Sequence, residues 1–331
     1  MLFQTQPIFE PGSQPFRQCH AASLVEVAGG DLLAAWFGGT HEGHADVAIW
    51  LARCMGGSWC APVKVAAVPG VPLWNPVLFR DQAGTVWLFY KIGPTIPAWT
   101  GAYIRSTDNG LTWGAPTFLP AGLLGPSKNK PLTLSNGEIL CGTSAETWQS
   151  WAGWVEISPD GGASWQRCGP IAFPSRPAES LDPRPADGFA GVIQPAVWEY
   201  APGRLKMLLR PTQAVGFVCQ SLSDDYGRTW SAPEPTNLPN PNSGIDAVRL
   251  FDGRIALVYN PSQTSRSPLA LALSEDNGVT WPYQRLLESE PGEFSYPSII
   301  QAEDGLIHVV YTHRRTTIRH AVVDMEWIGK I

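Results

Sequence analysis

The sequence predicts an all-β fold, a six-bladed β-propeller built from four-stranded antiparallel blades. An eight-residue phrase with a Gly turn recurs four times at intervals near 50 residues, a period typical of stacked or radial arrays. Six units, each with a polar opening, an apolar run, a Gly and a second apolar run, follow one another along the chain. The apolar runs are short and lack helical periodicity. We therefore treat residues 1–331 as one propeller domain.

The recurring phrase is predicted to form a turn between two outer strands. Its four copies are Ser106–Trp113 (STDNGLTW), Ser158–Trp165 (SPDGGASW), Ser223–Trp230 (SDDYGRTW) and Ser274–Trp281 (SEDNGVTW). A worn fifth copy, Ala52–Trp59 (ARCMGGSW), keeps only the second Gly, the Ser and the Trp. Asp-x-Gly favours a tight turn with a positive φ, and the Trp can cover a small satellite core. These turns are structural and name no substrate.

Each of the six units opens with a polar residue at the head of the expected innermost strand. The heads are His20, Asn75, Lys130, Gln194, Asp246 and Tyr296, with spacings of 55, 55, 64, 52 and 50 residues. The long step holds a Pro-rich insertion, residues 174–188, which we expect to be a surface loop. Seven blades would leave about 47 residues for each, and no seventh head is found. The N-terminal LFQTQPIF is expected to add an outer strand to the last blade.

The strand heads and the loops after each second strand are expected at one end of the ring. Those loops span residues 38–46, 91–95, 142–148, 210–213, 260–266 and 312–317. Any single polar residue in them has a plainer explanation, an ordinary solvated loop. Because six loops and six heads converge on one place, we instead predict a ligand site there.

The residue types of this convergent set indicate an acidic ligand. Arg pairs with carboxylates in a bidentate manner, while His and Tyr can transfer protons. His41 and His44, three residues apart, would suit a metal on a helix face, but this segment is a loop that feeds a strand. We therefore predict no metal and no cofactor.

Bulk properties exclude several other classes of protein. The net charge of −6 argues against a nucleic-acid partner, which would require a basic stripe. No apolar stretch is long enough to cross a membrane. The start of the chain has no basic segment followed by an apolar run. We expect a cytoplasmic monomer or small homo-oligomer whose partner is an acidic oligosaccharide.

The whole chain resembles the sialidase superfamily, in which the repeated turn is called the Asp box. Three stretches carry the resemblance: LLRPTQAVGFVCQSLSDDYG, NPSQTSRSPLALALSEDNG and EFSYPSIIQAEDGLIHVVY. It implies that Arg210 and Arg266 bind a carboxylate and that Tyr296 is the catalytic tyrosine. Sialidases depart from the usual two-carboxylate glycosidases by using a Tyr nucleophile.

The departures from the sialidase pattern are equally informative. Cys19-His20-Ala21 stands where sialidases have Arg-Ile-Pro, so the first arginine of the triad is missing. Gln194 replaces the Glu that activates the tyrosine, and Thr312 replaces the Glu that orients the first arginine. The loop expected to carry the acid Asp offers His41, Glu42 and His44, with Asp46 as an imperfect match. Changes at related positions predict altered chemistry.

A set of His, Tyr and Arg on such a propeller also resembles ulvan lyases and rhamnose–glucuronate lyases. This resemblance implies β-elimination at a uronic acid. Arg210 and Arg266 would neutralise the carboxylate, because a charged uronate is barely acidic at C5. His20 or His41 would remove the proton, and Tyr296 or the other His would protonate the departing oxygen. The predicted substrate-binding residues are Arg210, Arg266, Lys130, Gln194, Asp246, Asn75, Glu42, His44 and Arg315.

We accordingly predict a lyase that cleaves a uronic-acid glycoside. The alternative is an exo-sialidase-like hydrolase with a Tyr nucleophile. A second alternative is a non-catalytic glycan-binding propeller.

Overall fold

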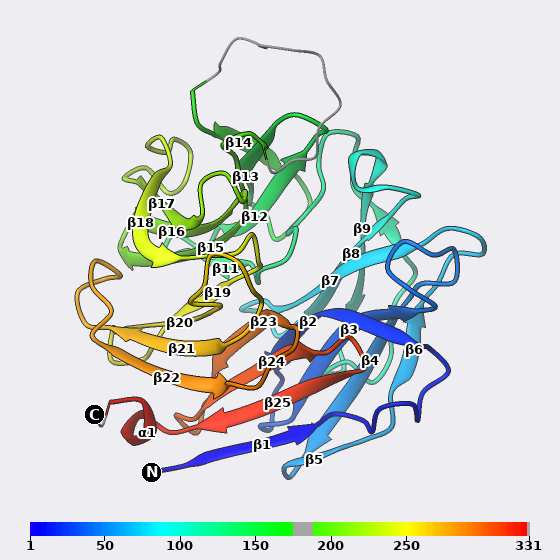
Figure 1. Cartoon of the computed structure of the whole chain (residues 1–331). Helices are drawn as coiled ribbons and strands as arrows, with labels where there is room; N and C mark the ends of the chain where they lie inside the picture. Colours follow the sequence, from blue (N-terminus) through cyan, green and yellow to red (C-terminus); the bar gives the residue numbers. More distant parts are fainter. Residues whose placement is uncertain (175–187, 330–331) are drawn as a thin grey trace.

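The computed structural model describes residues 1–174 and 188–329 and confirms the six-bladed propeller (Figure 1). Six antiparallel sheets surround a common centre, and each runs outward from its innermost strand. The insertion predicted at residues 174–188 lies, apart from its two end residues, outside the described part of the chain. The helices found in the described ranges are too short and too polar to cross a bilayer.

The blades follow one another in chain order. Blade 1 contains β2 (Gln18–Glu26), β3 (Leu32–Gly39), β4 (Ala48–Met55), β5 (Ser58–Trp59) and β6 (Val63–Ala66), and both β5 and β6 pair with β4. Blade 2 contains β7 (Leu73–Arg80), β8 (Val86–Ile92), β9 (Thr100–Ser106) and β10 (Thr117–Phe118). Blade 3 contains β11 (Leu132–Thr133), β12 (Ile139–Glu146), β13 (Trp151–Ser158) and β14 (Gln166–Ile171).

The second half of the ring has the same plan. Blade 4 contains β15 (Val192–Ala201), β16 (Arg204–Pro211), β17 (Phe217–Ser223) and β18 (Glu234–Pro239). Blade 5 contains β19 (Asp246–Arg249), β20 (Ile255–Tyr259), β21 (Leu269–Ser274) and β22 (Tyr283–Glu288). Blade 6 contains β23 (Phe294–Gln301), β24 (Ile307–His313), β25 (Thr317–Val323) and β1 (Phe3–Pro7). Two short helical elements are η1 (Ile96–Ala98) and α1 (Met325–Gly329).

The first strand of the chain completes the last blade. β1 pairs antiparallel with β25, so that Phe3 lies opposite Val323 and Pro7 opposite Arg319. The N- and C-terminal segments therefore run side by side (Figure 1). This pairing closes the ring, as the LFQTQPIF segment predicted.

The recurring phrase forms a turn held by its own polar side chains. In blade 5, the Ser274 hydroxyl donates to Asp276 Oδ1 at 2.8 Å and accepts from the amide of Gly278 at 2.7 Å. Asp276 also accepts from the amide and the hydroxyl of Thr280, at 2.8 and 2.5 Å. Asn277 and Gly278 both have positive φ, 59° and 74°. The phrase is thus the structural turn that its composition predicts.

These turns also fasten each blade to the one before it. A Cβ atom on Gly227 of blade 4 would lie 2.6 Å from Leu140 of blade 3, so only glycine allows this approach. At the worn copy in blade 1, Trp59 Nε1 instead donates to His320 Nδ1 of blade 6 at 3.2 Å. Blades 1 and 6 are therefore joined by this hydrogen bond, although the fifth copy of the phrase lacks the aspartate.

The innermost strands of four blades begin with a β-bulge. Positive φ values between 39° and 58° occur at Ala21, Asn75, Gln194 and Tyr296. The pairing register shifts at the same points of β2, β7, β15 and β23. A bulge re-aims a side chain, and the side chains of Gln194 and Tyr296 meet across the ring.

A buried lysine fills the centre of the ring beneath these strand heads. Lys128 Nζ donates to three oxygens: Asn129 Oδ1, Ile245 O and Pro297 O. Three acceptors match the three donors of an ammonium group. Burial lowers the pKa of Lys128 to about 7, although Asp246 opposes the shift. A Cβ on Gly244 would lie 3.2–3.4 Å from Lys128, Gln194 and Tyr296, so the lysine directly underlies both side chains.

Candidate active site

Tyr296 stands at the centre of the polar cluster, at the head of β23. Its phenol oxygen accepts from Arg210 Nη1 at 2.6 Å and from Gln194 Nε2 at 3.2 Å. The ring is buried, with 8% of the residue exposed. The two donors fix the position of the phenol oxygen and can stabilise negative charge that develops on it during a reaction.

Arg210, the next-to-last residue of β16, contacts Asn242, Gln194 and the rings of Trp151 and Tyr296. Its Nε donates to Asn242 Oδ1 at 2.9 Å, and its Nη1 also reaches Gln194 Oε1 at 3.3 Å. Its guanidinium lies 5.7 Å from the ring of Trp151 and 5.6 Å from that of Tyr296. Since Gln194 Oε1 faces the arginine, its NH₂ group faces the phenol, and Gln194 cannot accept a proton from Tyr296.

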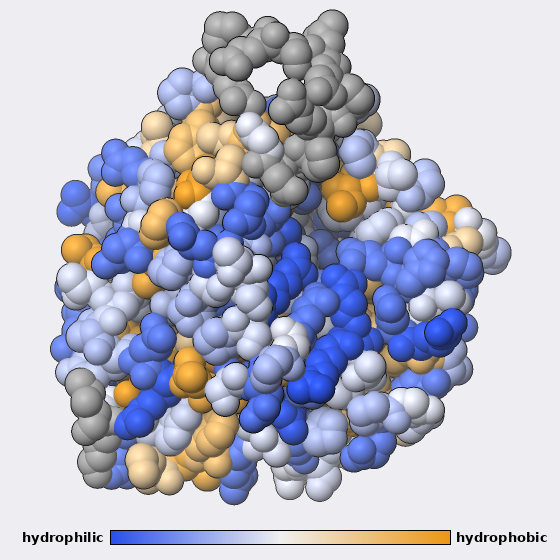
Figure 2. All heavy atoms as spheres, viewed as in Figure 1, coloured by the Kyte–Doolittle hydropathy of each residue, from blue (hydrophilic) through white to orange (hydrophobic). Residues whose placement is uncertain are grey.

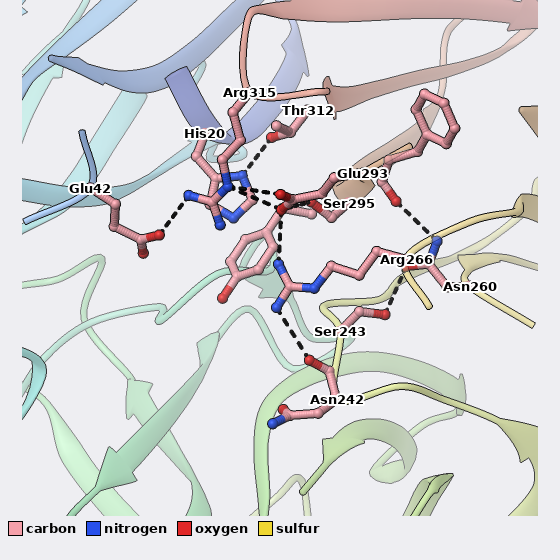
Figure 3. Close-up of polar contacts among 12 residues, drawn as sticks. His20, Glu42, Asn242, Ser243, Asn260, Arg266, Glu293, Ser295, Thr312 and Arg315 are labelled. Carbon is pink, nitrogen blue, oxygen red and sulfur yellow. Dashed lines mark hydrogen bonds and ion pairs between the residues drawn. The ribbon is translucent and has the colours of Figure 1, made fainter. Parts of the chain in front are cut away.

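Glu293 joins two further arginines beside the same tyrosine. It accepts from Arg266 Nη1 at 3.1 Å and from Arg315 Nε at 3.0 Å, and Figure 3 shows it between the two side chains. Arg315 Nη1 in turn donates to Glu42 at 2.7 Å. Although burial alone would raise the pKa of Glu293, the hydrogen bond and charge of Arg315, with the charge of Arg266, lower it. All four side chains keep between 23% and 36% of their surface exposed, so a ligand can reach them.

His20, at the head of β2, lies against the tyrosine ring. Its ring centroid is 4.2 Å from that of Tyr296, and its Nδ1 makes a 2.9 Å hydrogen bond with Thr312 Oγ1 (Figure 3). The residue is 2% exposed. Burial, followed by the charges of Arg315, Arg266, Arg210 and Lys128, lowers the pKa of His20 well below its usual value. The imidazole is therefore neutral, and it contacts Thr312, which stands where the sialidase pattern has a Glu.

The loop 38–46 contributes only one of its candidates to this cluster. Glu42 reaches Arg315, whereas His41 Nδ1 donates to the carbonyl of Glu42 and its ring lies 5.1 Å from that of His44. His44 in turn pairs with Asp46 at 2.7 Å. For the residues described, His41 and His44 find their partners within the loop and are exposed to solvent. The structure thus brings His20, and not His41, to Tyr296.

Lys130 and Asp246 do not join the arginines, contrary to the prediction. Lys130 Nζ binds Asp246 Oδ2 at 2.8 Å, and the same oxygen accepts from the amide of Ile299 at 2.9 Å. Lys130 lines a depression together with the last residues of β2, β7 and β23, at the opposite end of the channel. Blades 3 and 5 have no positive φ at their strand heads, so the repeat in sequence does not mark the same point in space there. Asn75 is also structural, since its Nδ2 donates to the Ser127 carbonyl at 3.0 Å.

Sequence reasoning missed three polar residues of the cluster. Asn242 orients Arg210, Glu293 couples Arg266 to Arg315, and Glu146 lies at the end of β12 with a buried Oε1. Burial raises the pKa of Glu146 to about 7, against the charge of Arg210 and together with the charge of Glu42. Only Glu146 had a signal, because it lies in one of the six loops predicted to converge. No group of three or more His, Cys, Asp and Glu is placed to hold a metal among the residues described.

The resulting site is a ring of three guanidiniums and three carboxyls around one tyrosine. Figure 2 shows hydrophilic residues gathered around a hollow near the centre of the propeller face that it presents. The arrangement can bind an anionic group through the arginines, present the Tyr296 oxygen as a nucleophile and move a proton at Glu146. The first arginine of the sialidase pattern is absent, and a third arginine, Arg315, joins Arg210 and Arg266 from the β24–β25 turn.

Comparison with known proteins gives consistent matches. The family model described as "BNR repeat-like domain" matches residues 30–309. A sialidase of Micromonospora viridifaciens is 29% identical over 143 residues, which cover 40% of this chain and 22% of that protein. A sialidase of Bacteroides fragilis (strain YCH46) is 26% identical over 226 residues, 62% of this chain and 38% of that protein. The chain thus spans between a fifth and two fifths of the length of these relatives.

Solved structures share the whole propeller. The Hadza microbial sialidase Hz136 superposes with a TM-score of 0.81 at 18% identity, covering 98% of this chain and 69% of that one. The intramolecular trans-sialidase from Ruminococcus gnavus, in complex with oseltamivir carboxylate, gives 0.74 at 14% identity and covers 98% of both chains. At these identities the likeness is one of fold, and the chemistry has to be argued from the side chains.

Proposed function

The chain belongs to the BNR repeat-like domain family, and we propose that it is a sialidase-like glycosidase that releases a carboxylated sugar from a glycan. The observation that carries the proposal is the 2.6 Å hydrogen bond from Arg210 to the phenol oxygen of Tyr296, beside two further arginines. The sialidases among its relatives support hydrolysis over the elimination that the sequence favoured.

The charges of the cluster favour binding of a ligand that carries one carboxylate. Within the described residues, three arginines face two carboxylates that are already ion-paired, Glu42 and Glu293, so the guanidiniums outnumber these carboxylates by one. His20 is neutral and adds none. A ligand carboxylate would complete the balance by binding the partly exposed guanidiniums of Arg266 and Arg315, and bidentate pairing would fix its orientation.

Tyr296 would be the nucleophile. As the phenolate, its oxygen would bond to the anomeric carbon while the glycosidic C–O bond breaks and the departing oxygen takes up a proton. Water would then attack the same carbon and release Tyr296 as the phenolate again. Arg210 and Gln194 stabilise this leaving group in each cycle, because both donate to its oxygen. The nucleophile in this proposal is the phenolate, because Gln194 is an amide and cannot take up the phenol proton.

Elimination at a uronate remains the second candidate because of one contact. A neutral imidazole, His20, lies 4.2 Å from the Tyr296 ring, centroid to centroid, which places a candidate base beside a candidate acid. Against it, the imidazole is 2% exposed and its Nδ1 is engaged by Thr312. A base must reach the proton that it abstracts, and burial of His20 under the tyrosine restricts that reach.

A parallel assay separates the two chemistries. The chain is incubated with a chromogenic sialoside and, separately, with uronate-containing oligosaccharides. We expect free sialic acid from the first and no unsaturated product, detected by ultraviolet absorbance, from the second. Tyr296→Phe should reduce kcat/KM by at least about 1000-fold, as loss of a nucleophile does. Tyr283→Phe, on the outer strand β22, is the matched control.

The products of this assay distinguish a hydrolase, a lyase and a glycan-binding propeller. Unsaturated sugar without free sialic acid would replace the hydrolase by the lyase. Binding of the sialoside without any product would leave a glycan-binding propeller. Sialic acid release that survives Tyr296→Phe would contradict the role given to the tyrosine.

A further inference from the structure

Glu146 is the one carboxyl of the cluster that no arginine holds in an ion pair within the described residues. It is the last residue of β12 and lies opposite Trp151 in the β12–β13 pair. The Trp151 ring, in turn, is 5.7 Å from the guanidinium of Arg210. Side chains two apart in a strand share a face, and Ser144 accepts from the amide of Gln194 at 2.8 Å on that face. Glu146 is therefore directed toward the blade that carries Gln194 and Arg210.

The carboxyl of Glu146 is unusually placed for a structural residue. Its Oε1 is buried and makes no hydrogen bond with any described residue. A buried polar atom without a partner is costly, and native proteins keep few of them. The charged groups that act on it are Arg210 and Glu42, both members of the site. An unpaired oxygen that faces a ligand site is explained if the ligand supplies its partner.

The other acidic and basic groups of the site are already committed. Glu42 and Glu293 are ion-paired with Arg315, and His20 is engaged by Thr312. For Asp46, the bonds from Thr40 and His44 outweigh burial and lower its pKa to about 2, so it holds no proton at neutral pH. Burial has the opposite result for Glu146, whose pKa is raised to about 7. A general acid works best when it titrates near the working pH.

We infer that Glu146 is the proton donor to the departing glycosidic oxygen, an inference that rests on the proposed function. As Tyr296 bonds to the anomeric carbon, the electrons of the breaking C–O bond pass to that oxygen, which takes the Glu146 proton. In the second step the Glu146 carboxylate removes a proton from the attacking water, and Tyr296 leaves as the phenolate. Glu146 is thus restored, and the net reaction consumes one water.

The proposal predicts a dependence on the leaving group. Two sialosides are compared, one with a nitrophenyl leaving group and one whose leaving group is another sugar. The nitrophenolate departs without a proton, whereas the sugar alkoxide requires one. For Glu146→Gln, kcat/KM should fall about 100- to 1000-fold on the sugar-linked substrate and stay within about threefold on the nitrophenyl substrate. The alkaline limb of the pH profile on the sugar-linked substrate should disappear in the same variant.

Glu234→Gln is the matched control, because it makes the same change at an exposed position of β18. It should leave both substrates unaffected. An equal fall on the two substrates for Glu146→Gln, or no fall on either, would overturn the inference while the proposed function stands. If the native chain cleaves neither sialoside, the proposed function fails, and this role of Glu146 fails with it.

A second measurement tests the protonation of Glu146 without any activity. A carboxyl with a raised pKa in the folded state stabilises the fold below the unfolded pKa and loses that contribution as pH rises through the folded value. Relative to the native chain, Glu146→Gln should therefore gain a few degrees in Tm at pH 8.5 over its value at pH 5.5. The same difference at both pH values would contradict a carboxyl that keeps its proton near neutrality.

Discussion

The Asp-box turns and the strand heads both recur around the ring, but the turns share their residues and hydrogen bonds, whereas the heads share only a backbone conformation. In the turns, equivalent residues make equivalent hydrogen bonds from blade to blade. In blades 4 and 5 the same serine hydroxyl binds the aspartate, and the same aspartate accepts from a threonine amide and hydroxyl. Gly227 and Gly278 take the same left-handed conformation, with φ of 84° and 74°. These bonds of the serine, the aspartate and the threonine are therefore the same in both blades.

At the strand heads of four blades, only the backbone conformation is repeated. Ala21, Asn75, Gln194 and Tyr296 share a positive φ, yet their side chains have nothing in common. Ala21 has no polar side chain, and Asn75 donates to the Ser127 carbonyl. Gln194 and Tyr296 form a hydrogen bond with each other in the site. A conformation that is costly for a non-glycine residue is kept while the residue varies, which is typical of a functional position. The turns therefore stabilise the fold, whereas the chemistry depends on the side chains at particular heads, above all Gln194 and Tyr296.

The largest effect expected from this division is at Arg315. Its guanidinium bridges Glu293 and Glu42, and a lysine would keep the charge but lose the fork. Arg315→Lys should lower kcat/KM for a carboxylated sugar by about 30- to 100-fold, or roughly 2–3 kcal/mol. The free energy of unfolding should change by less than about 1 kcal/mol, because the ion pair is partly exposed.

Exposed Arg204, paired with Asp224 at 3.0 Å, offers the same substitution away from the site. Arg204→Lys should leave kcat/KM unchanged. The measurement is steady-state kinetics with the native sugar and with its carboxyl-reduced alcohol. If Arg315→Lys weakens both ligands equally, Arg315 does not bind the carboxylate.

The same division explains how much could be predicted from the sequence. Repeated residues identified the blades and the turns, and the N-terminal LFQTQPIF segment identified the closing strand β1, because each is specified by local composition. Tyr296, Arg210 and Arg266 came from a resemblance that covers neighbouring residues as well. Lys130 and Asp246 were misplaced, because in blades 3 and 5 the polar opening is not at the bulge that points a side chain to the site.

Other parts of the site depend on contacts that no local pattern records. Glu293 becomes important only when Arg266 and Arg315, 49 residues apart in the sequence, approach it from two turns. The unpaired oxygen of Glu146 follows from how β12 packs against blade 4. His41 and His44 looked equivalent to His20 by residue type, and only burial separates them.

A smaller effect, on the pH dependence of stability, is expected at the incomplete copy of the phrase in blade 1. The blade 1 turn lacks the aspartate and instead uses Trp59, His320 and His308 in a chain of hydrogen bonds of 3.2 and 3.0 Å. Burial, with some repulsion from His308, lowers the pKa of His320 to about 3. A histidine with a lowered folded pKa stabilises the fold above its unfolded value near 6.5, and this contribution is lost as pH falls below it.

The native chain should therefore lose about 1–2 kcal/mol more unfolding free energy than His320→Gln between pH 7 and pH 5. Denaturant unfolding at a series of pH values measures this difference. The slope is compared, not the absolute stability, so a packing defect in the variant does not disturb the test. Parallel slopes would show that the seam between blades 1 and 6 does not depend on a neutral His320.

The smallest effect tests the intact turns. Asp276→Ala removes the bonds to Thr280 and Ser274, at a site open to solvent, and should cost about 1 kcal/mol of unfolding free energy. Asp225→Ala in blade 4 should cost a similar amount, and the double variant should be additive within about 0.5 kcal/mol. Glu275→Ala, at an adjacent exposed residue, is the control. In every variant kcat/KM should stay within about twofold, because the bonds of Asp225 and Asp276 stay within their own turns and reach no residue of the site. If activity declined in proportion to stability, the turns would be shaping the strand heads, and the separation of fold from chemistry would fail.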